Sequence, residues 1–281
     1  MGGSSILKEI PAIIIEHKRG WKRLNLHELW QYRDLIRVLV FREVQGRYRQ
    51  MAFGPLWIIL TPLFNMIVFT LVFGKLARLP SDGIPYPIFS YTALLPWAFF
   101  STALSGTASS FVKDMSLISK VYFPRLAIPI ARVLGALVDF LASFGVLLIM
   151  VLGFRITPTW GVLVLPFFLV LAACTALAIG LWLAALAVKF RDVTLGLGYG
   201  IQAWMYLSPV VYPTSLIPEQ LRFWYQLNPM TVVLDGFRWG LLGTRPPDWL
   251  SLVISCTLVF VLLIGGLYFF HRIETTIVDL L

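Results

Sequence analysis

The sequence predicts an all-α integral membrane protein with six transmembrane helices. Of its 281 residues, 58% are hydrophobic and only 13% are charged, and the mean hydropathy is +0.81. A soluble core of this chain length could not hide so much apolar surface, so a lipid bilayer is the expected solvent. The apolar residues also form long continuous runs, which favour helices over the alternating pattern of a membrane β-barrel.

Ten of the 23 Lys and Arg residues precede the first apolar run. Residues 1–26 are expected to form a cytoplasmic N-terminal segment, and they contain no small-residue cleavage site of a signal peptide. Residues 27–50 then mix apolar side chains and arginines at helical spacing. We expect an amphipathic interfacial helix lying on the inner leaflet, and a plain basic anchor for the first span is the alternative.

Crossing the hydrocarbon requires about 20 apolar residues in helical conformation. Six stretches come close to this length or exceed it, at about 51–74, 84–111, 127–153, 161–188, 193–213 and 249–270. Only the third contains charged residues, Arg132 and Asp139. Residues 51–270 therefore form one six-helix transmembrane domain, and residues 271–281 form a tail.

The distribution of basic residues predicts the orientation of the chain. With both termini in the cytoplasm, sixteen Lys and Arg residues face the cytoplasm and six face the other side, while Arg132 lies within a span. Membrane proteins concentrate Lys and Arg in their cytoplasmic loops. We therefore expect both termini and the N-terminal helix on the cytoplasmic side.

The segment between the last two spans is expected to form short extracytoplasmic helices. Ser215 can cap a helix with Pro218 in its first turn, and the dipeptide at 228–229 ends that helix. A second helix is expected over about 230–242, ended by Gly243. Aromatic residues on both helices suit either the headgroup region or a lid over an exit, and the residues alone leave both interpretations open. These aromatic residues are Phe223, Trp224, Tyr225, Phe237 and Trp239.

The sequence contains no motif typical of catalysis. It has no G-x-x-x-x-G-K-[ST] phosphate-binding loop, so any ATP would be bound by a partner. It has no H-E-x-x-H or G-x-S-x-G motif, its three His residues are far apart, and Cys174 and Cys256 lack metal-ligand spacing. We expect no enzyme activity, cofactor or metal in this chain. The scattered basic residues also argue against nucleic-acid binding.

Arg132 and Asp139 are the ionisable residues expected inside the membrane. They lie seven residues apart, or about 10 Å along a helix. This separation is too large for a direct ion pair but suits a bridging network. A structural role for Asp139 is favoured over an ion or proton relay, because a relay usually needs several acidic or His groups at membrane depth. Arg132 is expected to extend its guanidinium toward the cytoplasmic interface.

Aromatic residues follow the first and fifth expected spans toward membrane depth. Helix packing is one explanation for them. A pathway for sugars is the other, because sugar rings stack well on aromatic faces. The residues are Phe53, Trp57 and Phe64 in the first span, and Tyr199, Trp204 and Tyr206 in the fifth.

Nine short motifs are spread along the chain. They are RYRQMAFGPLW (47–57), TPL (61–63), LPWAFF (95–100), SKVYFPR (119–125), LVDF (137–140), FRDV (190–193), YLSPVVYP (206–213), LNPM (227–230) and FRWGLLG (237–243). In this order they resemble the ABC-2 type permeases that export O-antigen, capsular polysaccharide and teichoic acid. The resemblance covers about residues 29–270. Phe53 departs from it, because many members have Leu or Ile before this glycine.

The resemblance implies a permease subunit of an ATP-binding cassette exporter for polyprenyl-diphosphate-linked polysaccharide, with O-antigen as the first choice. Teichoic acid, capsule or a small amphiphilic drug are the alternatives. It also implies a homodimer with two copies of a separate ATP-binding subunit, which holds ATP and Mg, in the inner membrane of a prokaryote. Rival classes fit less well. A membrane-bound glycosyltransferase or phosphatase would need acidic or His residues gathered at one membrane face, and the sequence shows no such gathering. An ion-coupled carrier would need inverted repeats with broken helices and buried carboxylates, and only Pro166 and Pro209 suggest helix breaks.

The resemblance further implies roles for particular residues. A coupling helix that docks on the ATP-binding subunit would contain Lys113, Asp114, Ser116, Leu117, Ile118, Ser119 and Lys120. Span one of one protomer would pack against span five of the other, and Phe53, Trp57, Tyr199, Tyr206 and Tyr212 would line the channel. Phe223, Trp224, Tyr225 and Trp239 would form the outer gate. Arg42, Arg47 and Arg49 are placed to guide an anionic lipid head at the cytoplasmic entrance, although simple membrane anchoring explains each of them singly.

Overall fold

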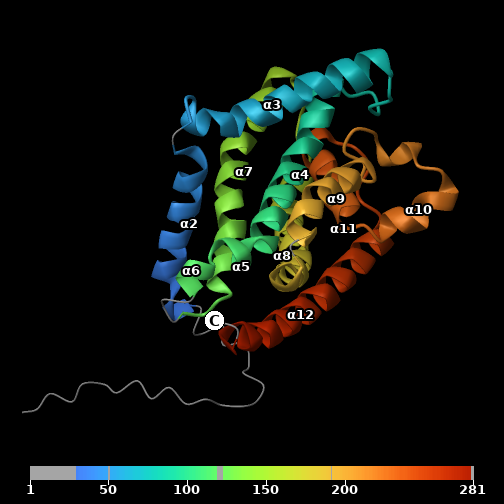
Figure 1. Cartoon of the computed structure of the whole chain (residues 1–281). Helices are drawn as coiled ribbons and strands as arrows, with labels where there is room; N and C mark the ends of the chain where they lie inside the picture. Colours follow the sequence, from blue (N-terminus) through green and yellow to red (C-terminus); the bar gives the residue numbers. More distant parts are fainter. Residues whose placement is uncertain (1–29, 50, 119–122, 191, 280–281) are drawn as a thin grey trace, which may run out of the picture.

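The computed structural model describes residues 30–49, 51–118, 123–190 and 192–279, and this part of the chain is helical with no strand (Figure 1). The first half contains α2 (Arg33–Tyr48), η1 (Gly54–Leu56), α3 (Trp57–Phe69), η2 (Thr70–Leu76), α4 (Tyr86–Ala108), α5 (Ser110–Lys113), α6 (Met115–Ile118) and α7 (Ala127–Gly153). The second half contains η3 (Trp160–Val164), α8 (Leu165–Lys189), α9 (Asp192–Tyr206), η4 (Thr214–Leu216), α10 (Glu219–Gln226), α11 (Pro229–Leu242) and α12 (Trp249–Asp279).

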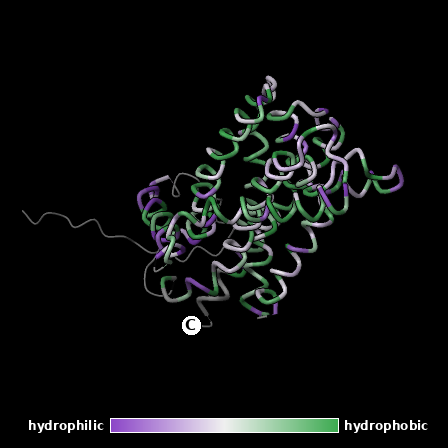
Figure 2. Tube along the Cα trace, turned by 90° about the horizontal axis from the view of Figure 1, so that it is seen from above, coloured by the Kyte–Doolittle hydropathy of each residue, from purple (hydrophilic) through white to green (hydrophobic). Residues whose placement is uncertain are grey.

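Five helical segments in the described part of the chain are long and apolar enough to cross a membrane. They are Gly54–Leu76, Tyr86–Ala108, Ala127–Gly153, Trp160–Lys189 and Trp249–Ile273. Figure 2 shows hydrophobic residues along most of the helices and hydrophilic residues in a few short stretches. The protein is therefore a multi-pass membrane protein, as its composition predicts.

The expected span over residues 193–213 differs from the prediction. Its helix, α9, has 15 residues and ends at Tyr206, and residues 207–212 form turns and bends. Pro209 explains the end, because proline lacks a backbone N–H and disfavours helical conformation in the residue before it. Among the described helices, five rather than six thus have the length and hydropathy of a span.

Helix α4 forms the centre of the bundle. It packs against α7, α8 and α11, and Phe89, Tyr91 and Phe100 on it are completely buried. The contact with α8 is close, because a Cβ atom at Gly180 would lie 2.5 Å from Thr107 Cγ2. The absence of a side chain at this position therefore sets the distance between the two helices.

Helices α3 and α9 contribute little to the buried core. Pro62 is the only buried residue of α3, and Ile201 is the only one of α9. In Figure 1, α3 runs across the upper part of α7 and α4. Pro62 has no N–H for the carbonyl of Ile58, and the hydroxyl of Ser143 on α7 donates to that carbonyl at 2.9 Å instead. Thus α3 is attached to α7 near its start, while its apolar surface stays open.

The beginning and the end of the described chain meet at one end of the bundle (Figure 1). Leu39 of α2, Phe111 of α5 and Phe270 of α12 belong to one hydrophobic cluster. The rings of Phe111 and Phe270 stack with their centroids 4.4 Å apart. We call this end of the molecule the terminal end.

Gly180 provides a test of the packing between α4 and α8. Replacing it with alanine should lower the free energy of unfolding by about 1–3 kcal/mol, because the new methyl group overlaps Thr107. Gly145 on α7 is the matched control, since a Cβ there meets nothing within 4 Å. Thermal unfolding of the detergent-purified protein should show a lower Tm for Gly180→Ala and no decrease for Gly145→Ala. Equal Tm values for the two variants would contradict the observed packing.

Candidate functional site

Six charged residues at the terminal end form one ion-pair network. They are Arg42, Glu43 and Arg47 on α2, Asp114 between α5 and α6, and Arg132 and Asp139 on α7.

The network has two linked halves. Arg42 and Arg132 both donate to the carboxylate of Asp114, at 2.6 and 2.5 Å. Arg132 also forms an ion pair with Glu43. Arg47 then donates to Glu43 at 3.0 Å and to Asp139 at 2.5 Å. Three positive and three negative charges therefore balance within one cluster.

Helix geometry explains why these residues meet. Glu43 and Arg47 are four residues apart on α2, and Arg132 and Asp139 are seven apart on α7, so each pair lies on one helix face. Gly135 lies between the two α7 residues, and a Cβ there would lie 3.1 Å from Glu43 Cγ. This glycine lets α2 approach α7 closely enough for Glu43 and Arg47 to link Arg132 with Asp139.

The network is shielded from water except at Arg42. The side chain of Arg132 is 12% exposed and that of Asp114 is 9% exposed, whereas that of Arg42 is 52% exposed. Removing one member of such a buried set leaves its partner unpaired in a medium of low dielectric constant. Burial, followed by the neighbouring Asp139 carboxylate, also raises the pKa of Tyr48 to about 12.

The expected coupling segment consists of two helical turns joined at Asp114. Lys113 ends α5 and is exposed, whereas Leu117 on α6 packs against the cluster around Phe111. Ser119 and Lys120 lie outside the described residues, as do the side chains of Ser116 and Ile118. Within the described residues, the segment is therefore attached to the bundle by the ion pairs of Asp114 with Arg42 and Arg132 and by apolar contacts such as that of Leu117.

The three arginines expected at a substrate entrance lie in different surroundings. Arg42 and Arg47 are paired with carboxylates of this chain, so their charges are largely neutralised. Arg49 follows the end of α2 and is exposed. Of the three, Arg49 is thus the one whose charge faces solvent without a carboxylate partner within the described part of the chain.

A cavity of about 570 Å³ begins where the network ends. Its walls come from the end of α2 and from α3, α4 and α7, and they combine Arg47 and Asp139 with the rings of Trp57, Phe99 and Phe140. Asp139 Oδ1 is buried there and has no hydrogen-bond partner within the described residues. Aromatic rings and one carboxylate oxygen without a hydrogen-bond partner among the described residues thus lie next to the ion pairs.

The structure brings some of the expected channel residues together and leaves others apart. The rings of Phe53 and Trp57 meet edge to face, with centroids 6.0 Å apart. The hydroxyl of Tyr212 donates to the carbonyl of Tyr206 at 3.0 Å. Tyr199 is 79% exposed on α9. The side chains on α3 and α9 are thus available for contacts outside this chain.

The outer helices match the sequence signals only in part. Asn228 caps α11 by accepting from the N–H of Met230 at 3.1 Å, and Gly243 ends α11 with a φ of 73°. The expectation that Ser215 caps the first outer helix was wrong, since Pro218 occupies the cap position of α10 and Ser215 lies in η4. Ser215 instead donates to Asp82 at 2.9 Å, which ties η4 to the loop before α4.

The four expected gate aromatics fall into different settings. Phe223 and Trp224 on α10 are exposed and contact each other edge to face. The hydroxyls of Tyr225 and Tyr212 lie 2.7 Å apart. Trp239 on α11 packs edge to face on Trp160, with centroids 4.9 Å apart. Of the two outer helices, only α10 therefore presents its expected gate aromatics, Phe223 and Trp224, as exposed rings.

Arg238 on α11 is a residue whose role the sequence did not reveal. It is 2% exposed and donates to the carbonyls of Pro209 and Val210 at 2.7 and 2.8 Å. Its guanidinium also lies 3.8 Å from the centroid of the Phe89 ring. These bonds satisfy carbonyls that the turns after α9 leave open. The sequence did contain one signal of this buried role, because Arg238 follows Asp235 by three residues in a largely apolar helix.

Glu43 provides a test of the network. Replacing it with glutamine should lower the free energy of unfolding by about 1–3 kcal/mol, because Arg132 and Arg47 lose a shared buried partner. Asp34→Asn on the same helix is the control, since its pair with Arg37 is about three-quarters exposed and should contribute less than about 1 kcal/mol. Thermal unfolding of both variants measures the difference. A Glu43→Gln variant as stable as Asp34→Asn would contradict a structural role for the network.

Comparison with known proteins gives relatives along nearly the whole chain. The O-antigen export system permease protein RfbA of Myxococcus xanthus is 33% identical over 241 residues, which cover 85% of this chain and 92% of that protein. A permease of the same name from Klebsiella pneumoniae is 26% identical over 253 residues, or 88% of this chain and 95% of that protein. The polysialic acid transport protein KpsM of Escherichia coli is 22% identical over 243 residues, or 85% and 93%.

The family comparison agrees with these relatives and with the resemblance seen in the sequence. Residues 34–242, well over half of the chain, match the model of the ABC-2 type transporter. The network, the coupling segment and the outer helices up to Leu242 all lie within the matched region. The chain therefore belongs to the ABC-2 type transporter family, whose membrane permeases lack an ATPase domain and work with an ATP-binding partner.

Proposed function

We propose that this chain is the permease subunit of an exporter that moves a polyprenyl-diphosphate-linked polysaccharide of O-antigen type across the cytoplasmic membrane. The observation that carries the proposal is the 33% identity to an O-antigen export permease over 92% of that protein. A capsular polymer is the second candidate, because a polysialic acid transport protein is also related over most of its length.

The proposed assembly is a homodimer with two ATP-binding subunits. The exposed apolar surfaces of α3 and α9 support it, because Phe64 and Leu195 on them are 66% and 73% exposed. Both termini are proposed to be cytoplasmic, which requires an even number of crossings. The cluster that joins α2, α5 and the end of α12 supports this topology. In the proposed topology, helix α9 together with the turns that follow α9 makes the sixth crossing of the membrane.

The ion-pair network is proposed to couple ATP binding to channel opening. The α5–α6 segment would dock on the ATP-binding subunit, so a displacement of that subunit would first reach Asp114. Asp114 is bonded to Arg42 on α2 and to Arg132 on α7. Because both partners are charged, moving Asp114 alone would leave unpaired charges at low dielectric constant. We therefore expect the α5–α6 segment, α2 and the part of α7 that carries Arg132 and Asp139 to move together when the ATP-binding subunit moves.

Reconstitution tests the proposed function. The purified chain should hydrolyse no ATP alone. With its ATP-binding subunit in proteoliposomes, it should move lipid-linked O-antigen polysaccharide in an ATP-dependent way. Replacing Lys113, Asp114 and Lys120 with alanine should disturb ATP hydrolysis and transport by the complex, whereas Asp34→Asn should leave both unchanged.

Several outcomes of this experiment would contradict the proposal. If no ATP-binding subunit associates with the chain, the proposed assembly is refuted. An ion-coupled mechanism centred on Asp139 would then be the favoured alternative. Transport of polysialic acid, teichoic acid or a small amphiphile in place of O-antigen would refute the proposed substrate while leaving the assembly intact.

Disulfide cross-linking tests the dimer arrangement. With Cys174 and Cys256 replaced by serine, a chain carrying both Phe64→Cys and Tyr199→Cys should form a cross-linked dimer on mild oxidation, because α3 of one protomer would face α9 of the other. Phe260→Cys with Tyr199→Cys is the control, since Phe260 on α12 is also exposed but lies outside the proposed contact. Stronger cross-linking in the control pair would contradict the arrangement.

A further inference from the structure

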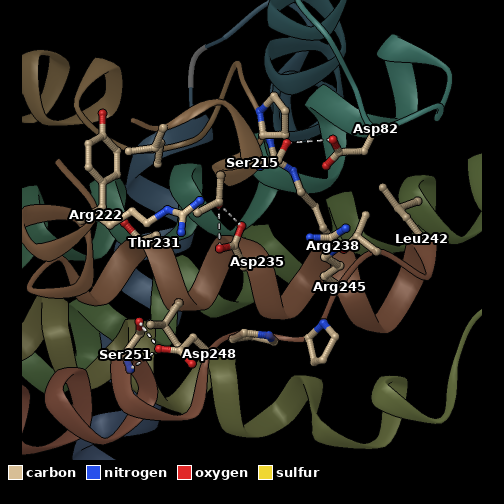
Figure 3. Close-up of a pocket in the computed structure, with 18 of the residues that line it drawn as sticks. Asp82, Ser215, Arg222, Thr231, Asp235, Arg238, Leu242, Arg245, Asp248 and Ser251 are labelled. Carbon is tan, nitrogen blue, oxygen red and sulfur yellow. Dashed lines mark hydrogen bonds between the residues drawn. The ribbon is translucent and has the colours of Figure 1, made fainter. Parts of the chain in front are cut away.

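A cavity of about 970 Å³ is lined by charged, hydroxyl and apolar side chains (Figure 3). Its walls come from α10, α11, the loop between α11 and α12, and the loop before α4. Asp248 and Ser251 line it at the start of α12, whereas Phe270 near the other end of α12 belongs to the cluster at the terminal end. The cavity and the network therefore lie at opposite ends of the 31-residue helix.

The three carboxylates that line the cavity each accept hydrogen bonds from hydroxyl groups of this chain. Thr214 donates to Asp235 at 2.6 Å, and Ser215 donates to Asp82 at 2.9 Å. Ser251 lies 3.3 Å from Asp248 and donates to it. Each acidic side chain is thus engaged at least once within the cavity wall.

Several donors in the same wall lack comparable partners. Arg238 Nε and Thr231 Oγ1 are buried and have no hydrogen-bond partner within the described residues. Arg245 makes no hydrogen bond or ion pair within the same part of the chain. Arg222 has one long contact of 3.7 Å, with the exposed Glu219. The cavity thus offers more donors than its own acceptors use.

We propose that this cavity binds an acidic sugar, meaning a saccharide unit that carries a phosphoryl or carboxyl group. The guanidinium groups of Arg222 and Arg245 suit such an anion, because their planar N–H groups match its oxygen atoms in pairs. Tyr225 and Leu242 supply apolar surfaces against which a sugar ring can pack. The volume lies within the range of pockets that bind small molecules, about 300–1,000 Å³.

The proposed function makes the terminal end cytoplasmic and so places this cavity on the exit side of the membrane. That placement rests on the proposed function, but the binding of an acidic sugar does not. The acidic sugar could belong to the exported polymer or to a molecule in the surrounding solution, and an anionic lipid headgroup could present the same phosphoryl group. All of these sources would meet the same arginines.

Isothermal titration calorimetry of the full-length chain in phosphatidylcholine nanodiscs, in phosphate-free buffer, tests the proposal. Glucose 1-phosphate should bind, glucuronate should compete with it, and glucose should do neither. The double variant Arg222→Gln, Arg245→Gln should bind glucose 1-phosphate at least about tenfold more weakly. Arg155→Gln is the control, because Arg155 is an exposed arginine outside the cavity.

Nanodiscs that contain phosphatidylglycerol separate the sources. Weaker glucose 1-phosphate binding in these discs would identify a lipid headgroup as a ligand of the site, and unchanged binding would favour a soluble or polymer-borne sugar. Equal binding of glucose and glucose 1-phosphate, no binding of either, or undiminished binding by the double variant would overturn the proposal. The titration contains neither the ATP-binding subunit nor polymer, so its result is independent of the export experiment.

Discussion

The charge of Arg132 governs the arrangement of the terminal end of the molecule. An unpaired guanidinium in the apolar helix α7 would be strongly destabilising, so the fold must bring carboxylates to it. Asp114 supplies one from the α5–α6 joint, and Glu43 supplies the other from α2. Arg47 then neutralises the remaining charges of Glu43 and Asp139. A single buried charge thus binds three separate parts of the chain, including the segment proposed to contact the ATP-binding subunit.

The opposite end of the molecule uses a buried arginine in a different way. Arg238 is bonded to backbone carbonyls after α9, and the hydroxyl of Tyr86 on α4 donates to the carbonyl of Val211 in the same turn at 2.6 Å. The end of α9 is therefore fixed to the buried core, although most of the helix is exposed. Similarly, α3 is fixed to α7 through Ser143 while its surface remains open. Both helices pack on the core along one side and leave apolar side chains such as Phe64 and Leu195 exposed on the other, which suits the walls of a channel between two protomers.

The sequence predicts the features that depend on local signals. Apolar runs indicate the all-helical membrane class, and Asn228 and Gly243 mark the two ends of α11. Hydropathy could not give the length of α9, because residues 207–213 are nearly as apolar as a span and turn chemistry around Pro209 ends the helix. The spacing of Arg132 and Asp139 indicated that a bridge was needed. It could not identify Arg47, which lies 92 positions from Asp139 in the chain, because such pairing depends on how α2 packs on α7.

We propose that α2 and the part of α7 that carries Arg132 and Asp139 move as one body when nucleotide binds. Electron paramagnetic resonance can test it by measuring the distance between spin labels at Val38 on α2 and Leu141 on α7, which are 63% and 58% exposed. The complete complex would be compared with and without a non-hydrolysable ATP analogue. We expect an unchanged distance within a protomer, together with a changed distance between the Val38 labels of the two protomers. A nucleotide-dependent change of the distance within a protomer would contradict it.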